Sequence, residues 1–255
     1  MRNNSIPLFV ALVLAVLAAS VLSHRPQPSP MTDRNDERVV TPDDAERPRS
    51  VNGNHQPLTN AQDWRAFLTR YSEELLATDD DRIKIPAEIR QTRWMGYPSA
   101  TEAAIAAAEK RLGQKLPPSL RAFYSVSNGW RETGYFIRDV LPVESIDWLR
   151  QRDPQLYHLA RKAEFQPGPF RKDPGDQRLK QYREQQGTRV RRSLSISSRG
   201  DAALFLLDPG ADPHDGEWPA GRWASWNPGM EWTAKSFGEL MQQEYETFLR
   251  LRDKK

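Results

Sequence analysis

The segment from Trp94 to Trp130 carries the strongest local folding signals in the chain, and it predicts two helices joined by a tight turn. Ser99 followed by Glu102 fits a capping box, in which hydroxyl and carboxylate oxygens accept from free N–H groups of the first helical turn. The alanine-rich run that follows has a high helix propensity. Gly113 stands where a helix commonly ends on a left-handed residue.

A second helix is predicted directly after this turn. Pro117 and Pro118 suit a first helical turn, because the N–H that proline lacks would be unpaired there. The Asn128-Gly129 pair is expected to end the helix, since both residues tolerate positive φ. Neither helix contains a catalytic motif, so the segment is expected to serve as scaffold.

The same segment holds a characteristic series: an acidic residue in an alanine-rich helix, Leu-Gly, Leu-Pro, an aromatic residue and a closing Ser-Asn-Gly-Trp. These residues are Glu109, Leu112, Gly113, Leu116, Pro117, Phe123, Ser127, Asn128, Gly129 and Trp130. In order and spacing they resemble the SUKH superfamily, which includes Smi/Knr-type fungal cell-wall regulators and many bacterial immunity proteins. The later order of strand, acidic turn, strand and Ser-Phe-x-Glu-Leu helix is also similar to that family. Each piece alone is common in two-helix hairpins.

Composition excludes several classes of function. The chain has 255 residues, enough for one or two domains. Its net charge of +3 does not indicate nucleic-acid binding. It contains no cysteine, which excludes disulfides, thiol catalysis and cysteine metal sites.

Residues 1–23 are predicted to be a signal peptide or an N-terminal membrane anchor. Leu8 to Leu22 is an uninterrupted apolar run after a small positive region. Counted from Ile6, it would form roughly 25 Å of helix, against the ~30 Å of a bilayer core. Both alternatives place the following domain on the periplasmic side of the inner membrane, either anchored by residues 6–22 or secreted after cleavage.

Residues 24–59 are predicted to be a disordered linker. They are rich in proline, aspartate, arginine, asparagine and serine, and have too few apolar residues to offset the entropy of ordering. As a flexible coil, this segment would span roughly 30–40 Å. The sequence therefore predicts a globular domain, residues 60–255, on a long tether.

The order of elements in this domain predicts an α+β fold with an antiparallel or mixed sheet packed against helices. Helices are expected from Asn60, at 142–149, at 153–162 and from Ser236. Strands are expected at 135–137, 194–197, 202–207 and 222–226. The run at 202–207 is continuously apolar, so it is expected to be a central strand.

Residues 150–199 are markedly basic, with 13 arginine or lysine residues and 5 acidic ones. Part of this segment is predicted to be loop, because it contains Pro167, Pro169, Pro174 and Gly175. One interpretation is a patch for an acidic partner or an anionic envelope surface. The other is a solvated face balanced by the acidic segment that follows.

Two features are candidates for chemistry. His158 is expected on a helix surface, and no serine or acidic partner can be placed around it. The acidic loop (Asp208, Asp212, His214, Asp215 and Glu217) has oxygen ligands, but its spacing does not fit the calcium-loop pattern. The favoured interpretation is a polar turn that joins two strands. We therefore predict no catalytic residue, no metal and no cofactor.

Aromatic residues are the remaining candidates for binding. Tryptophan and arginine are enriched among the residues that dominate interfaces, whereas the alternative is that these tryptophans cover the sheet and the last helix. Tryptophan faces also bind sugar rings, so a wall polymer stays open as a ligand. The predicted partner-binding residues are Trp130, Arg131, Trp218, Trp223, Trp226 and Trp232.

The resemblance implies a non-catalytic, protein-binding immunity protein that neutralises a bacterial toxin, here in the cell envelope. The alternative is an envelope regulator or scaffold that binds a synthase or a wall polymer. A third possibility is a hydrolase that uses a metal in the loop from Asp208 to Glu217. No nucleic-acid partner is expected.

Overall fold

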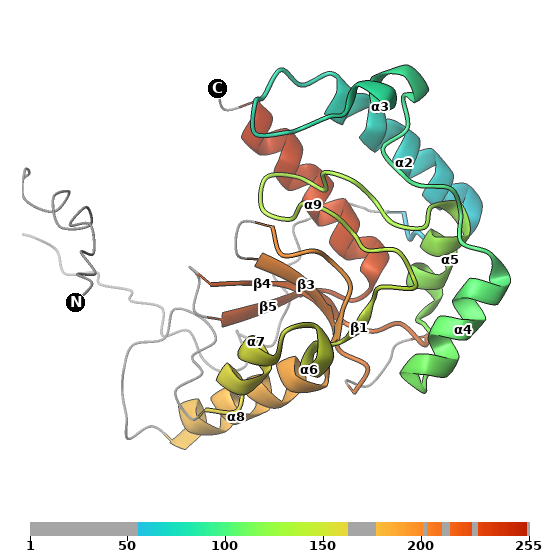
Figure 1. Ribbon diagram of the computed structural model, residues 1–255. Helices are drawn as coiled ribbons and strands as arrows, with labels where there is room; N and C mark the ends of the chain where they lie inside the picture. The colour runs from blue at the N-terminus through green and yellow to red at the C-terminus, as the bar shows by residue number, and fades with distance from the viewer. Residues whose placement is uncertain (1–55, 163–176, 201–202, 211–214, 226–228, 254–255) are drawn as a thin grey trace, which may run out of the picture. The chain divides into compact units, whose positions relative to one another are not determined.

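A computed structural model describes residues 56–162, 177–200, 203–210, 215–225 and 229–253 (Figure 1). The predicted hydrophobic segment, residues 1–23, lies outside the described residues, as does nearly all of the predicted linker. The helices and strands of the described residues confirm an α+β fold with an antiparallel sheet.

The sheet has five strands in the order β1-β2-β3-β4-β5, and every neighbouring pair is antiparallel. The central apolar strand pairs with the next strand in the sequence, because Leu204 lies opposite Trp223 and Leu207 opposite Ala220. The strands are β1 (Asp147–Trp148), β2 (Leu194–Ser195), β3 (Ala203–Leu207), β4 (Ala220–Ala224) and β5 (Gly229–Ala234).

Helices on one side of the sheet enclose the main core. Trp64 stacks on Phe237 with ring centroids 5.5 Å apart and meets Phe123 edge-on at 5.2 Å. Edge-on and offset contacts of this kind are favourable for aromatic pairs. We call this side the inner layer; it consists of α2 (Ala61–Leu76), α3 (Ala87–Thr92), α4 (Glu102–Leu112), α5 (Pro118–Val126) and α9 (Phe237–Arg252).

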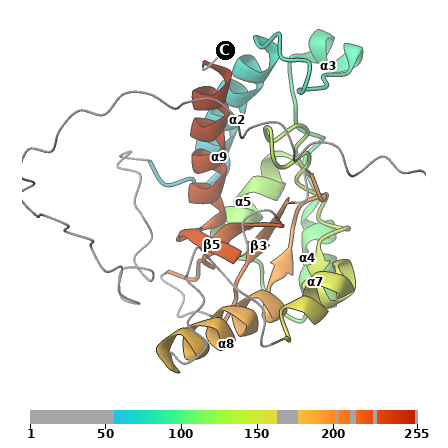
Figure 2. The same ribbon diagram turned by 90° about the vertical axis from the view of Figure 1, so that its left-hand side faces the viewer.

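Three further helices cover the opposite face, and we call them the outer layer: α6 (Leu149–Arg152), α7 (Pro154–Leu159) and α8 (Gln177–Arg192). In Figure 1 they lie below the strands, with α9 above, and Figure 2 shows α8 and α9 on opposite sides in the same way. Phe205 and Leu207 of β3 point into the inner core, whereas Leu204 and Leu206 contact the outer layer. Because both faces are covered, β3 is apolar at every position.

Three predicted helix starts are confirmed by their caps. Asn60, Asp153 and Ser236 each accept the backbone N–H three residues ahead, at 3.0, 2.9 and 3.1 Å. The predicted cap of α4 is wrong, since Thr101 accepts from the N–H of Ala104 and Ser99 lies before the helix. The N–H of Ala100 instead donates to the carbonyl of Tyr124, which holds the chain extended there.

Other predicted elements also differ from the structure. Residues 135–137 form no strand, and the helix predicted for 142–149 is replaced by a turn, β1 and the start of α6. The reason is the pairing with β2: the N–H of Leu141 donates to Ile196 and that of Leu149 donates to Ser193. Helices α3 and α8 and strand β5 were not predicted from the sequence. Helix α5 ends at Val126, two residues before the Asn-Gly pair.

Candidate functional site

The Ser-Asn-Gly sequence after α5 ties three segments together. The Ser127 hydroxyl accepts the N–H of Tyr97 at 2.9 Å and donates to the carbonyl of Gly129 at 2.5 Å. The Asn128 side chain accepts the N–H of Val143 at 2.8 Å. These bonds satisfy backbone groups that would otherwise be buried without partners. The loop therefore serves to hold the scaffold around α5 in place.

Gly129 occupies a position where a side chain does not fit. Its φ is +111°, and a Cβ atom would lie 2.9 Å from the carbonyl oxygen of Val140 and 3.3 Å from the nitrogen of Pro142. We expect Gly129→Ala to lower the free energy of unfolding by about 3 kcal/mol, from backbone strain plus this contact. Chemical denaturation measures the loss.

Gly113 supplies the matched control, because it also has positive φ (+72°) but no heavy atom lies within 4 Å of the place that a Cβ atom would take. Gly113→Ala should cost only the left-handed strain, about 1 kcal/mol. Equal losses for the two variants would contradict the argument from the Val140 contact.

Glu109 links the two helices of the Trp94–Trp130 segment. Its buried carboxylate accepts from Lys115 Nζ at 2.6 Å and from the N–H of Leu116 at 3.2 Å. Burial raises the pKa of this carboxyl, but the hydrogen bonds and nearby Arg121 outweigh burial, so the pKa lies below its ordinary value. Together with Leu112, which is part of the core, Glu109 is structural.

A partly exposed group of arginine and aromatic side chains lies beside this scaffold; we call it the arginine–aromatic surface, and define it as Arg65, Trp94, Tyr97 and Arg131. The Arg131 guanidinium lies 3.5 Å from the Tyr97 ring centre, and that of Arg65 lies 4.7 Å from the Trp94 ring. Arg131 also donates to the carbonyls of Met95 and Gly96 at 3.0 and 2.6 Å. Its guanidinium is thus fixed before any partner arrives.

The tryptophans predicted to bind a partner are mostly buried. Trp130 is 0% exposed and packs against Tyr71 and Trp94, while Trp218 is 7% and Trp223 6% exposed. Trp232 is half-buried and Trp226 lies outside the described residues. The outer layer covers the face of the sheet where Trp223 lies, whereas Trp130 and Trp218 are part of the inner core. These side chains offer a partner little surface, and of the predicted set Arg131 is the better placed.

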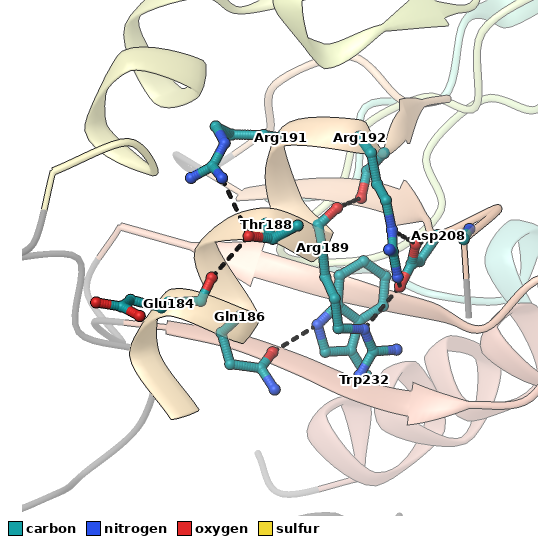
Figure 3. Close-up of polar contacts among 10 residues, drawn as sticks. Glu184, Gln186, Thr188, Arg189, Arg191, Arg192, Asp208 and Trp232 are labelled. Carbon is teal, nitrogen blue, oxygen red and sulfur yellow. Dashed lines mark hydrogen bonds and ion pairs between the residues drawn. The ribbon is translucent and has the colours of Figure 1, made fainter. Parts of the chain in front are cut away.

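Asp208 fixes the outer layer to the sheet (Figure 3). Its fully buried carboxylate accepts from Arg189 Nε at 2.7 Å and from Arg192 Nε and Nη2 at 2.5 and 2.9 Å. The Arg189 guanidinium lies 4.3 Å from the ring centre of Trp232, whose indole N–H donates to Gln186 at 2.8 Å. Burial raises the pKa of Asp208, but the two arginines outweigh it, so the pKa lies below the ordinary value.

The acidic loop does not assemble as a metal site in the described residues. Asp208 binds α8, whereas the Glu217 carboxylate accepts the N–H and hydroxyl of Ser119 at the start of α5, both at 2.7 Å. Asp212 and His214 lie outside the described residues. Within the ranges that the structure describes, no group of three or more acidic or histidine side chains is placed to hold a metal. His158 is exposed, with its ring beside Tyr157.

The turn that follows Arg131 contains a buried acid, Glu132, which has a positive φ of 48°. Burial raises the pKa of its carboxyl above the ordinary 4.5, and the negative charge of Asp139 adds to the effect. The folded protein therefore retains this proton to a higher pH than the unfolded chain does. As the pH rises from 4.5 through the folded-state pKa of Glu132, ionisation of this carboxyl lowers the free energy of unfolding of the wild type.

We expect Glu132→Gln to be more stable than the wild type at neutral pH, with the difference shrinking as the pH falls toward 4.5. Denaturation of both proteins across about pH 4–8 measures it. Glu73→Gln, at an exposed position of α2, is the control and should show no such trend. A Glu132→Gln advantage that grows toward acid pH would contradict the assignment.

The fold and the scaffold loop together define a SUKH-type α+β domain. The family model described as the SMI1 / KNR4 family (SUKH-1) matches residues 99–243, and the chain belongs to this family. SUKH domains are generally non-enzymatic immunity or regulatory domains. A search of curated proteins gave no match. In the part of the chain that the structure describes, no helix combines the length and apolarity needed to cross a bilayer.

Proposed function

We propose that this protein is a non-catalytic immunity protein, which binds a cognate bacterial toxin in the cell envelope and blocks it. The observation that carries the proposal is the use of the family signature: Glu109, Ser127, Asn128 and Gly129 serve the scaffold, and a preorganised arginine–aromatic surface lies next to them. Arginine and aromatic side chains on a rigid base are typical of interface hot spots.

The interface would resemble other specific complexes in size, roughly 1,600 Å² of total buried area. Arg131 would lie near its centre, since its guanidinium is already held by Met95 and Gly96 and stacks on Tyr97. Binding would then cost little side-chain entropy at this position. The partner is a protein, in keeping with the immunity and regulatory roles of the family.

The site of action is proposed from the N-terminal sequence. The apolar run from Leu8 to Leu22 would direct the domain to the periplasmic side of the inner membrane, anchored or secreted after cleavage. A toxin met there would attack wall, membrane or periplasmic targets. Protease treatment of spheroplasts tests this: digestion of the domain is expected, and a domain that stays protected would overturn the proposed location.

The functional test is rescue from a toxin. An immunity gene is expected beside a gene for a large toxin with a variable C-terminal domain, and co-expression with that domain should restore growth. Arg131→Ala should weaken the rescue at a temperature where the variant is still folded, although loss of the bonds to Met95 and Gly96 lowers its stability. Arg90→Ala, at an exposed position of α3, is the matched control and should rescue fully.

Failure of the wild type to rescue, with a wall synthase or polymer bound instead, would favour an envelope regulator. Rescue by Arg131→Ala equal to that of the wild type would move the interface away from the arginine–aromatic surface.

A further inference from the structure

The outward side of the outer layer is strongly basic. Helices α6, α7 and α8 all turn apolar side chains toward the same face of the sheet, including Leu149, Leu156 and Val190. Their remaining sides therefore share one molecular surface (Figures 1 and 2). In the described residues, the outer layer and the segment after β2 contain the basic residues Arg150, Arg152, Arg161, Lys162, Arg178, Lys180, Arg183, Arg189, Arg191, Arg192 and Arg199.

Part of this charge is committed to structure. Arg189 and Arg192 bind Asp208, and Arg199 binds Asp153. Arg191 donates to the carbonyl of Ala160 at 2.8 Å.

The remaining charge is concentrated at exposed positions. The acidic residues of the described parts of this layer are Asp153, which caps α7, and Glu184. Arg150, Arg152, Arg161 and Lys162 are exposed and have no ion-pair partner among the described residues. A surface with this density of unbalanced positive charge attracts anionic partners.

Leu159 adds an apolar contact at the same place. It is 42% exposed, at the end of α7, and two residues further on the chain reaches Arg161 and Lys162. Amphipathic segments that enter the boundary between headgroups and acyl chains combine apolar side chains with lysine and arginine, and Leu159 supplies one such apolar side chain here. A pocket of about 550 Å³ is lined by residues between positions 78 and 90, three of them aspartates. This pocket is not part of the basic surface of the outer layer.

We propose that the outer layer docks on an anionic phospholipid surface through the basic side chains of α6, the end of α7 and α8, with Leu159 at the contact. Each lysine or arginine near such a surface contributes about 1 kcal/mol of attraction. The apolar run of Leu8–Leu22 and a linker span of roughly 30–40 Å keep the domain within reach of a bilayer. Membrane docking by the outer layer is an activity beyond the proposed immunity function. It does not use the arginine–aromatic surface, which stays available for a toxin.

The test uses the full chain. Because the chain contains no cysteine, a single introduced thiol can be labelled selectively. Gln185→Cys on α8 reports on the outer layer and Gln114→Cys, after α4, on the inner layer; both positions are exposed. The fluorescent label is measured with vesicles that carry a headgroup-attached quencher. One set is phosphatidylcholine alone and the other is about one third phosphatidylglycerol.

We expect quenching at position 185 with the anionic vesicles, and loss of this quenching in about 0.5 M salt, where exposed charges are screened. Position 114 and the neutral vesicles should show only the background that the N-terminal run gives. A variant with four charges of the basic face removed should show quenching at position 185 reduced to that background. Its substitutions are Arg150→Gln, Arg152→Gln, Arg161→Gln and Lys162→Gln.

The matched control removes four positive charges from exposed positions of the inner-layer helices and should keep the quenching: Arg70→Gln, Arg90→Gln, Lys110→Gln and Arg250→Gln. Equal quenching at 185 and 114, or full quenching in the neutralised variant, would overturn the proposal. Absence of quenching together with weaker toxin binding by the neutralised variant would also overturn it and assign this face to an acidic protein.

Discussion

Replacing Trp130 by alanine is expected to lower the free energy of unfolding by about 3–5 kcal/mol, the usual cost of emptying a buried tryptophan site. The side chain is 0% exposed and packs between Tyr71, at 5.6 Å between ring centres, and Trp94, at 5.7 Å. The cavity would lie between α2 and the loop that follows α5, so both the helix and the loop lose packing. Chemical denaturation monitored by circular dichroism measures the loss.

Trp130→Phe is the informative second variant. It keeps an aromatic ring against Tyr71 and also removes the indole N–H, which is buried without a hydrogen-bond partner among the described residues. The expected cost is therefore smaller, about 1–2 kcal/mol. Toxin binding by Trp130→Phe should match the wild type at a temperature where both are folded. A loss of affinity without loss of stability would instead show that Trp130 contacts the partner.

Replacing Asp208 by alanine is expected to cost about 3 kcal/mol, near the low end for a broken buried ion pair. The carboxylate is fully buried, whereas Arg189 and Arg192 keep 19% and 38% side-chain exposure and can turn toward water. Without this carboxylate, α8 keeps its apolar contacts but loses its charged link to β3. Because the folded-state pKa of Asp208 is lowered, its contribution is present above the unfolded-state value and is lost as the pH falls through the folded value.

Asp81→Ala, at an exposed position, is the control and should change stability little. Hydrogen exchange gives a local readout, since loss of protection in Asp208→Ala should concentrate in α8 rather than in α2 or α9. The double variant Asp208→Ala with Arg192→Ala should lose less unfolding free energy than the two single variants lose in sum. Additive effects would contradict a direct ion pair.

Local signals in the sequence predict local structure well. Asn60, Asp153 and Ser236 cap helices because a polar side chain before an amphipathic run satisfies free N–H groups wherever the helix later packs. The central strand is also predictable, because only a strand covered on both faces is apolar at each position. The series from Glu109 to Gly129 identifies the family without any strand being placed.

The outer layer is not predictable in the same way. Helix α8 is so rich in arginine and glutamine that few apolar residues mark its buried side, which includes the polar Gln186 beside Val190. Its position depends on Asp208, which is 16 residues from Arg192 in sequence and has the local pattern of a polar turn. Because α8 is not predicted, Trp223 is expected on an uncovered face of the sheet and is counted among the partner-binding residues. In the structure, the outer layer covers this side chain.

The proposed function requires the protein to act by binding and not by chemistry. The most direct measurement titrates the purified wild-type chain against the toxin domain that the proposed function expects to be encoded beside it, and follows the toxin's activity. We expect inhibition to be complete at one equivalent, and intact active toxin to be recovered when the complex is dissociated. Lasting inactivation by a small fraction of an equivalent, with the toxin cleaved or modified, would show turnover and contradict the account.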